Sequence, residues 1–563
     1  MVLTDRPVRP VRFGTAVRPR VSPARTALVL GAAGVAYRLA ALLAGLPPTN
    51  SDEAVTGLVA LHVVQGREFP LFFYGQHYMG ALEAYLAAPL FAVAGPGVVA
   101  LRLPNLALYA LFLVLVWQLA RRLYHPWFAT AVVGLLALGS DRILKNQLIA
   151  GGGYPEMNPA GALLVLLAVL LGLGVVRRRA SAFAVFGLVA GLTLWDDWLV
   201  LPYVAAAGAL LLAGAGRDLV GRGGAALAAG LAVGLLPIVA HNLTAAPEHR
   251  SLAAYRQLGG GTPGDWVDRL HGGVVFGLPM GTGFCPPGRC AGWQLWWGVA
   301  APLLLAVAGL LALRALWILR PASLRRGVLC SASPRRGVLG PASPRRDDGV
   351  HTARIRQGGR LALVGAAAVS LAAYAGSAAA GDTPVESSRY LSCLLISLPA
   401  LLWPLWVAAG NHLLPAAARL TAWAGLAAVA GSAVLATGAL VADADTLTRA
   451  DERRRDLVVA LDRLGVRDFY ADYWTCYPVV FATRERLACG VIRDDLRAGW
   501  DRYPAYPARV ARADRVAYVS PTGTALSRAV ADHLAATGTP VTRTTVPGYD
   551  IHLPAAPVGL PLR

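Results

Sequence analysis

Long apolar runs recur along this chain of 563 residues, and each is about long enough to cross a lipid bilayer as a helix. A bilayer core requires roughly 20 apolar residues per helix, fewer where the helix is short or partly surrounded by protein. Only 15% of the residues are charged and the mean hydropathy is +0.51, values that water-soluble globular proteins rarely show. The sequence therefore predicts a polytopic α-helical membrane protein with about 11 spans, at residues 27–46, 98–120, 127–140, 158–176, 181–195, 198–215, 224–240, 294–318, 361–379, 391–409 and 417–442.

Arginine clusters between the apolar runs predict the orientation of the chain. Arg177–Arg179 precede the apolar segment 181–215 and Arg217 follows its second run, so the positive-inside rule places both ends in the cytoplasm. The segment then crosses twice, and Asp196 and Asp197 fall at an outer hairpin instead of mid-bilayer, where two carboxylates are costly. The formal net charge of +20 has the same explanation, so we expect no nucleic acid partner.

The same rule divides the chain into parts. An Arg- and Pro-rich cytoplasmic N-terminus, residues 1–26, leads into a transmembrane domain of residues 27–442, whose first extracytoplasmic loop is 47–97. Residues 320–360 contain a decapeptide repeat of Ser, Pro and Arg that cannot bury a core, which predicts a disordered cytoplasmic insertion near anionic membrane lipid. Residues 443–563 alternate helix-like and strand-like stretches, so we expect a small extracytoplasmic α/β domain.

Cysteines give an independent indication of sidedness. Cys285 and Cys290 lie in one predicted outer loop, and Cys476 and Cys489 lie in the outer C-terminal part. Paired cysteines outside suit an oxidising exterior, so we expect one disulfide within each pair. A metal site is the alternative, but neither pair has a His at ligand spacing.

Carboxylates recur in four predicted outer segments, each at the end of a span. They are Asp52 and Glu53, Asp141 and Glu156, Asp196 and Asp197, and Asp382 and Glu386. Because these span ends share one side of the membrane, helix packing can bring them to a common site, where carboxylates hold a divalent metal or accept a proton. Arg142, Lys145 and Arg389 lie among the acids and suit a phosphate-bearing substrate. For any single acid, simple solvation of a helix end is the competing explanation.

Several local patterns occur in a specific order over most of the chain. They are "NSDEAVTGLVA" after the first span, "YGQHYMGALEAYLAAPLF" followed by "ALRLPN", "GGGYPEMN", "GLLPIVAHNL", "ESSRYLS" and, in the C-terminal part, "YADYWTCYPVVFATRERLACGVI". This arrangement resembles the GT-C superfamily of integral-membrane glycosyltransferases, especially the family 39-like and RgtA/B/C/D-like bacterial members related to protein O-mannosyltransferases. The resemblance implies the GT-C fold and a hexosyl- or pentosyltransferase that uses a sugar on a polyprenyl phosphate.

The resemblance also implies roles for the acids of the first outer loop. In the superfamily an Asp of this loop is the catalytic base, so Asp52 is expected to take a proton from an acceptor hydroxyl while that hydroxyl attacks the anomeric carbon, with inversion, and the lipid phosphate leaves. Glu53 matches the second acid of the pair and is expected to orient Asp52 or to help hold a divalent metal such as Mg²⁺, Mn²⁺ or Zn²⁺. The acceptor is a glycan, lipid or protein of the cell envelope.

One departure from the family leaves the substrate open. The lipid A aminoarabinose transferases have a Lys-Pro-Pro element in the first outer loop, whereas this chain has "GQHYMGALEAY". Glu83 and His77 in this stretch are candidates for metal or substrate binding, with loop packing as an equal alternative. We assign Arg142, Lys145 and Arg389 to the lipid phosphate, and Glu156 to the acceptor or a metal.

The leading hypothesis is thus a transferase acting at the outer face of the cytoplasmic membrane, with its N-terminus inside and its C-terminus outside. The alternative is a transporter or flippase of lipid-linked precursors, although transporters more often place ionisable groups near mid-bilayer in broken helices. A catalytically silent scaffold with the same fold is the third hypothesis, and the intact Asp52 argues against it.

Overall fold

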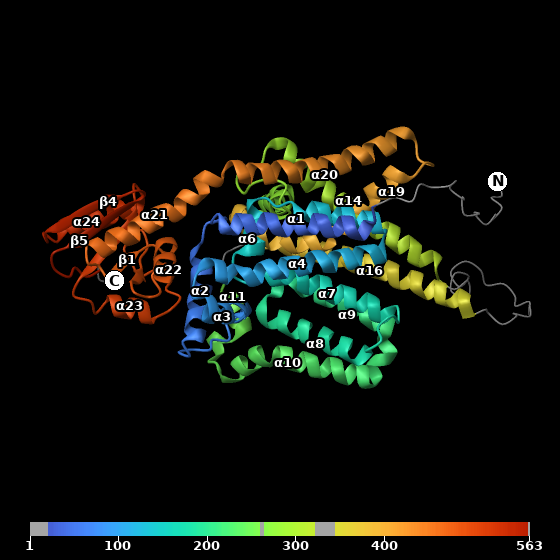
Figure 1. The fold of residues 1–563 in the computed structure, drawn as a ribbon, viewed down its shortest axis with the longest axis horizontal. Coiled ribbons are helices and arrows are strands. Elements are labelled where there is room, and N and C mark those ends of the chain that lie inside the picture. The colour runs from blue at the N-terminus through green and yellow to red at the C-terminus, as the bar shows by residue number, and fades with distance from the viewer. Residues whose placement is uncertain (1–20, 259–263, 321–343, 561–563) are drawn as a thin grey trace, which may run out of the picture.

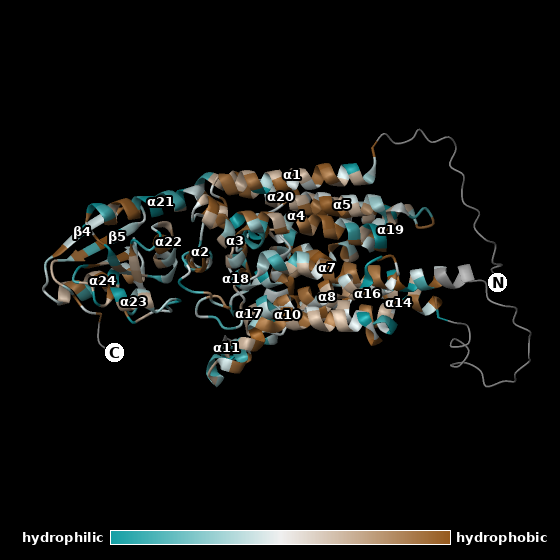
Figure 2. Ribbon diagram, turned by 60° about the horizontal axis from the view of Figure 1, so that its bottom comes forward, coloured by the Kyte–Doolittle hydropathy of each residue, from teal (hydrophilic) through white to brown (hydrophobic). Residues whose placement is uncertain are grey.

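The computed structural model describes residues 21–258, 264–320 and 344–560. A bundle of long helices fills most of the molecule, and a smaller domain that contains the only sheet of the described residues lies against one end of it (Figure 1). Figure 2 shows apolar residues along the bundle helices and many hydrophilic ones in α21 and around α17 and α18. The predicted fold class, a polytopic helical protein with a small C-terminal α/β domain, is confirmed.

Each predicted span overlaps a helix, although the bounds differ and the predicted span 391–409 begins in a 3₁₀ segment (Ser388–Ser397). The helices are α1 (Pro23–Leu43), α4 (Val98–Leu123), α5 (Pro126–Ala137), α7 (Tyr154–Gly172), α8 (Arg179–Asp196), α9 (Leu201–Ala215), α10 (Arg222–Thr244), α14 (Trp296–Ile318), α16 (Pro344–Ala375), α19 (Leu398–Gly410) and α20 (Ala416–Ala442). Within the described residues, nine helical segments are long and apolar enough to cross a membrane, or ten if α5 and α6 (Asp141–Leu148), bent by 92°, form one span. The remaining predicted span is α8, whose 18 residues begin with Arg179 and end with Asp196.

Shorter elements connect the long helices. They are α2 (Ser51–Val64), α3 (Leu82–Ala94), α11 (Ser251–Leu258), α12 (Trp266–Leu270), a π-helix (His271–Phe276), α13 (Gly277–Gly281), α17 (Ala378–Asp382), α18 (Pro384–Ser387), and 3₁₀ segments at Trp198–Val200, Gly216–Val220, Pro247–His249, Gly292–Leu295 and Ser388–Ser397. Two of them, α2 and α3, make up much of the predicted first outer loop.

Helices α8 and α10 run side by side in unusually close contact (Figure 1). A Cβ atom added at Gly187 of α8 would lie 2.1 Å from the carbonyl oxygen of Leu227, and one added at Gly230 of α10 would lie 2.1 Å from that of Ala184. Only glycine allows the backbones to approach this closely, which is the way small residues drive helix packing in membranes.

The bend between α5 and α6 is held by an arginine inside the bundle. The last carbonyl groups of a helix lack partners within that helix, and in an apolar environment they need another donor. Arg38 of α1, fully buried, donates from Nη1 to the Ala137 carbonyl at 2.9 Å and from Nη2 to the Leu138 carbonyl at 3.0 Å. Its Nε donates to Oε1 of Gln147 in α6 at 2.7 Å, so one guanidinium joins both halves of the bend.

The C-terminal domain follows α20 directly and consists of helices around a five-stranded sheet. Its elements are α21 (Ala444–Arg463), β1 (Asp468–Ala471), α22 (Tyr473–Ala482), β2 (Ala488–Val491), α23 (Ala505–Val510), β3 (Val516–Pro521), α24 (Ala525–Ala536), β4 (Val541–Val546) and β5 (Tyr549–Pro554). The strand order is β2-β1-β3-β5-β4; β1 is parallel to β2 and β3, whereas β5 is antiparallel to β3 and β4.

Helices α2 and α3 share an apolar core with the C-terminal domain. Ala54, Val55, Leu58 and Ala84 belong to the same cluster of buried residues as Phe469, Val480 and Phe481. A Cβ atom added at Gly57 would lie 2.5 Å from the ring of Phe481, so α2 and α22 pack without any spare space. The C-terminal domain and the first loop therefore share one hydrophobic core, which is a closer association than a surface contact.

One domain prediction needs correction. The predicted disordered insertion was 320–360, but residues 344–360 form the first half of α16. Residues 344–350 of the third repeat copy thus belong to this helix, and Ile355, which is 5% exposed, packs in the bundle farther along it. Residues 321–343 of that insertion, and residues 1–20 of the predicted N-terminal segment, lie outside the described residues.

Candidate functional site

Asp52 lies in the first turn of α2, at the end of the bundle that meets the C-terminal domain (Figure 1). The helix begins there because the Asn50 side chain caps it, with Oδ1 accepting from the Glu53 N–H at 2.9 Å. The Asp52 side chain is 21% exposed, and its Oδ1 accepts a hydrogen bond of 2.6 Å from the Tyr473 hydroxyl. Nη2 of Arg502 lies 3.5 Å from the same oxygen. The predicted base is thus accessible and held by two residues of the C-terminal domain.

Tyr473 is suited to donate to this carboxylate. Burial, together with the negative charge of Asp52, raises the pKa of Tyr473 well above its usual value. The hydroxyl therefore keeps its proton and directs it at Asp52. Tyr473 itself is fixed at the start of α22, where its carbonyl accepts from the Ser51 hydroxyl at 2.6 Å.

Glu53 does not share a site with Asp52. Successive residues of an α-helix point about 100° apart, and both carboxylate oxygens of Glu53 accept from Arg102 of α4 at 2.6 Å. Both side chains are fully buried. The expectation that Glu53 orients Asp52 or holds a metal is therefore wrong in this structure, because its oxygens are used to tie α2 to the bundle.

A glycine loop separates Asp52 from a second group of acids. A Cβ atom added at Gly151 would lie 3.2 Å from Cβ of Asp52, and one added at Gly153 would lie 2.8 Å from Cβ of Asp197. Gly153 also has a φ of 78°, in the left-handed region that favours glycine. The loop leaves no room for side chains on either side, so it fixes the spacing between the base and these acids.

Glu83, at the start of α3, is hydrogen-bonded to the backbone of this glycine loop. Its two carboxylate oxygens accept from the N–H groups of Gly151 and Gly152 at 3.2 and 3.1 Å. Burial, followed by the charge of nearby Asp196, raises the pKa of Glu83 to about 8, and the backbone donors oppose this shift. Glu83 therefore serves mainly to hold the loop, which supports the packing alternative for this residue.

Glu156, another predicted site residue, is buried without hydrogen bonds to its carboxylate among the described residues. It is 6% exposed, and neither carboxylate oxygen has a hydrogen-bond partner among the described residues. Its charge lies close to those of Glu83 and Asp196. Even so, no three His, Cys, Asp or Glu side chains of the described chain are placed to hold a metal ion together. Metal binding by these residues therefore stays a prediction.

His77 lies in a different environment. Its ring stacks on His241 with centroids 5.0 Å apart and contacts His249 edge to face at 5.4 Å. Burial, and then the two neighbouring histidines, lower the pKa of His77. The structure thus brings Glu83 and Glu156 together but gives His77 a packing role beside the end of α10.

The three predicted phosphate-binding residues differ in what they already contact. Lys145 pairs with Asp141 at 2.9 Å, and Arg142 donates to the carbonyl oxygen of Val385. Arg389 lies over the rings of Tyr154 and Tyr390, 5.6 Å from each centroid. Its Nε is buried and has no hydrogen-bond partner in the described chain. Of the three, Arg389 is the one whose side chain makes no ion pair and no hydrogen bond to a carbonyl group among the described residues.

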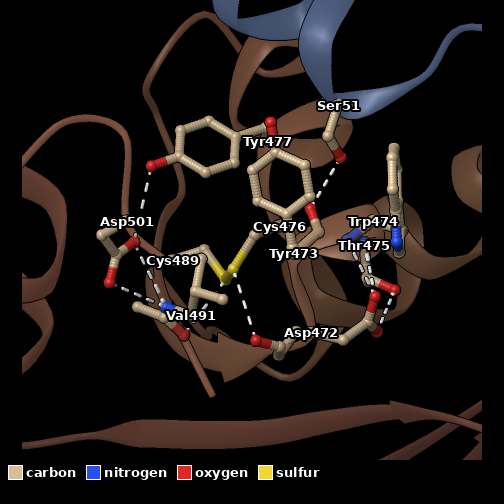
Figure 3. The surroundings of a disulfide bond; sticks show 12 residues. Ser51, Asp472, Tyr473, Trp474, Thr475, Cys476, Tyr477, Cys489, Val491 and Asp501 are labelled. Atoms are coloured by element: carbon tan, nitrogen blue, oxygen red, sulfur yellow. Dashed lines mark hydrogen bonds between the residues drawn. A yellow bond between two sulfur atoms is a disulfide. The ribbon is translucent and has the colours of Figure 1, made fainter. Parts of the chain in front are cut away.

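The predicted cysteine pairs are joined as disulfides. Cys285 and Cys290 have Cα atoms 5.1 Å apart, and Cys476 and Cys489 have Cα atoms 5.4 Å apart. The second bond links α22 to β2 just beside Tyr473 (Figure 3). It thereby fixes the helix that presents the tyrosine to Asp52.

Arg502 and Tyr473 are the site residues that sequence reasoning missed. Both lie more than 400 positions from Asp52 along the chain, and the sequence gives no indication that the C-terminal domain folds back onto the first loop. The motif "YADYWTCYP" was noticed as part of a resemblance, but nothing in it distinguishes Tyr473 from the neighbouring aromatic residues.

A network of polar contacts docks the domain beside this site. His62 of α2 contacts Oε1 of Glu485 through Nε2 at 2.9 Å, and Tyr506 donates to the same oxygen at 2.9 Å. Arg67 pairs with the other oxygen of Glu485. Burial alone would raise the pKa of Glu485, but the hydrogen bonds from His62 and Arg67 outweigh it and lower that pKa to about 2.

Replacing Glu485 with Gln is expected to lower the thermal stability of the protein at pH 6 and to reduce its acid sensitivity. A carboxyl whose pKa is depressed below its ordinary value of 4.5 stabilises the folded state above that pH, and the contribution is lost as pH falls toward 2. Unfolding midpoints measured between pH 6 and pH 3 should therefore converge for wild type and Glu485→Gln. The exposed Glu452 of α21 gives the control, Glu452→Gln. A constant gap at all pH values would contradict the role of Glu485.

Comparison with known proteins finds similarity in structure only. No protein-family model matches the sequence, and no curated protein matches it. The structure is similar to a crystal structure of ArnT from Cupriavidus metallidurans bound to undecaprenyl phosphate, with a TM-score of 0.55 and 13% identity over 94% of this chain and 97% of that one. It is also similar to the apo state of the same enzyme, with a TM-score of 0.52 and 14% identity over 94% of this chain and 98% of that one. At these identities the likeness concerns the fold.

Proposed function

We propose, for a chain that has the GT-C fold, that the protein is a glycosyltransferase of the cytoplasmic membrane. It moves a sugar from a polyprenyl-phosphate-linked donor to a hydroxyl of a glycan, lipid or protein acceptor at the outer face, with inversion. The observation that carries the proposal is the accessible carboxylate of Asp52, which accepts a hydrogen bond from Tyr473 and lies beside the guanidinium group of Arg502.

The reaction needs one proton acceptor and a site for a leaving phosphate. Asp52 takes the proton of the acceptor hydroxyl while its oxygen forms a bond to the anomeric carbon. The bond from that carbon to the phosphate oxygen breaks, and its electron pair stays on the phosphate. Negative charge therefore grows on the phosphate as the bond breaks, and a fixed guanidinium such as that of Arg389 stabilises it.

Two features support this class of donor and this side of the membrane. The ArnT structure of similar fold contains undecaprenyl phosphate, a polyprenyl phosphate. The disulfide Cys476–Cys489 lies in the domain that contacts Asp52, and disulfides persist in oxidising compartments outside the cytoplasm. The disulfide is consistent with a C-terminus outside.

The test is sugar transfer by the purified full-length protein in nanodiscs. We expect at least one radiolabelled polyprenyl-phosphate sugar from a panel of hexoses and pentoses to lose its sugar to an acceptor preparation from envelope extracts, with release of polyprenyl phosphate. Product with retained anomeric configuration would contradict the inverting mechanism. Movement of labelled lipid across liposomes without any sugar release would favour the transport alternative.

A further inference from the structure

Arg502 is a buried cation that is only partly satisfied by the protein. Its side chain is 5% exposed, Nε donates to the Tyr473 hydroxyl at 3.1 Å, and Nη2 lies 3.5 Å from Oδ1 of Asp52. Nη1 is buried and has no hydrogen-bond partner among the residues that the structure describes. A buried donor without a partner is costly, so the free N–H groups of Nη1 indicate a missing acceptor.

The guanidinium is held in place from both sides of the domain contact. It lies 3.7 Å from the ring centroid of Trp500 in its own domain and 5.0 Å from that of Phe73 in the first loop. The N–H of Tyr503, the next residue, donates to the Tyr477 hydroxyl at 3.2 Å. Stacking on aromatic faces fixes the plane of a guanidinium and leaves its edge free for bidentate contacts.

Few protein acceptors lie within reach of Arg502. Among the described residues its one carboxylate partner is Asp52, which Nη2 approaches and Nη1 does not, because Glu53 pairs with Arg102. A phosphate oxygen would satisfy Nη1, since guanidinium and phosphate form strong charge-assisted hydrogen bonds.

We propose that Arg502 of the C-terminal domain binds the phosphate of the polyprenyl-phosphate donor together with Arg389 of the bundle. This proposal rests on the proposed function and adds a phosphate contact from a domain that lies outside the bundle. Tyr473 is then a positioning residue, because its hydroxyl accepts from Arg502 and donates to Asp52. The phosphate contact and the orientation of the base are thereby linked through one hydroxyl group.

Binding of undecaprenyl phosphate to the full-length protein in nanodiscs of zwitterionic lipid tests this assignment. A charged hydrogen bond contributes about 1.5–3 kcal/mol, so Arg502→Gln is expected to raise Kd about 10- to 100-fold. Undecaprenol, which lacks the phosphate, should bind wild type and Arg502→Gln equally. Arg486→Gln is the matched control, because Arg486 pairs with Asp462 on the surface of the same domain. An anionic phospholipid added to the nanodisc should not displace the ligand, and equal competition would reassign the site to membrane lipid.

Further variants separate a phosphate contact from a purely structural role. Tyr473→Phe should slow sugar transfer but leave the Kd for undecaprenyl phosphate within about twofold, because the guanidinium remains. Arg502→Lys keeps the charge and should bind with an intermediate Kd, and it replaces Arg502→Gln if that variant does not fold.

An equal loss of undecaprenol and undecaprenyl phosphate binding in Arg502→Gln, an unchanged Kd, or no binding of undecaprenyl phosphate to wild type would each overturn the inference. Phosphate binding that depends on Arg502 without any sugar transfer would leave the inference standing and contradict the proposed function. Sugar transfer without dependence on Arg502 would contradict the inference alone.

Discussion

Asp52→Asn is expected to lower kcat for sugar transfer by about 10²–10⁴-fold, the usual contribution of a general base. The amide keeps an oxygen that can accept the Tyr473 hydrogen bond, so the local geometry should persist while proton acceptance is lost. Affinity for undecaprenyl phosphate should therefore change little. Initial rates at saturating donor, together with a direct binding measurement, distinguish the two effects.

The control for this experiment is Asp462→Asn, at a surface carboxylate that pairs with Arg486. It should transfer sugar at the wild-type rate. If Asp52→Asn transfers sugar as fast as wild type, Asp52 is not the base. The next candidate is then Glu156, whose carboxylate has no hydrogen-bond partner among the described residues.

Glu53→Gln is expected to lower the free energy of unfolding by about 3–5 kcal/mol, because removing one partner of a buried ion pair leaves an uncompensated charge. Both oxygens of Glu53 accept from Arg102, and both side chains are fully buried. Equilibrium unfolding in mixed detergent micelles measures the difference. The surface variant Asp462→Asn should change it by about 0.5 kcal/mol or less.

A double substitution tells whether the loss comes from the uncompensated buried charge. Glu53→Met combined with Arg102→Met should recover most of the stability, since apolar replacements of similar volume often match a buried ion pair. A double variant as unstable as the single one would instead mean that the pair's geometry holds α2 against α4 in a way that packing cannot replace.

The spans could be predicted because the bilayer imposes a length and a composition on each one. Even the division of residues 181–215 into α8 and the following helix was indicated, since arginines flank the segment and acids occupy its middle. The sheet was predicted less completely. The strand-like stretches 467–472, 515–520 and 540–546 correspond to β1, β3 and β4, whereas the sequence pattern does not predict β2 and β5. Strand β2, "ACGV", has only four residues, all buried, and so shows no alternation of apolar and polar positions.

The site was only partly predictable, for reasons that concern distance along the chain. Asp52 was identified through a resemblance in the motif that contains it. Its neighbour Glu53 has the same charge and an adjacent position, yet the helix turns it toward Arg102, which sequence spacing does not reveal. Preferring Arg389 to Lys145 as a phosphate ligand requires knowing that Lys145 is paired with Asp141. Identifying Arg502 requires knowing that the C-terminal domain contacts the first loop at Asp52.

The apolar core that α2 and α3 share with the C-terminal domain has a mechanical consequence. Helix α2, which carries the proposed base Asp52, packs into the core of that domain, and the Glu53–Arg102 ion pair connects the same helix to the bundle. If the domain tilts to admit a bulky acceptor, Asp52, Tyr473 and Arg502 move as one unit, while Arg389 stays with the bundle. Opening would then separate the two arginines from each other without disturbing the base, and closure would reunite them around the donor.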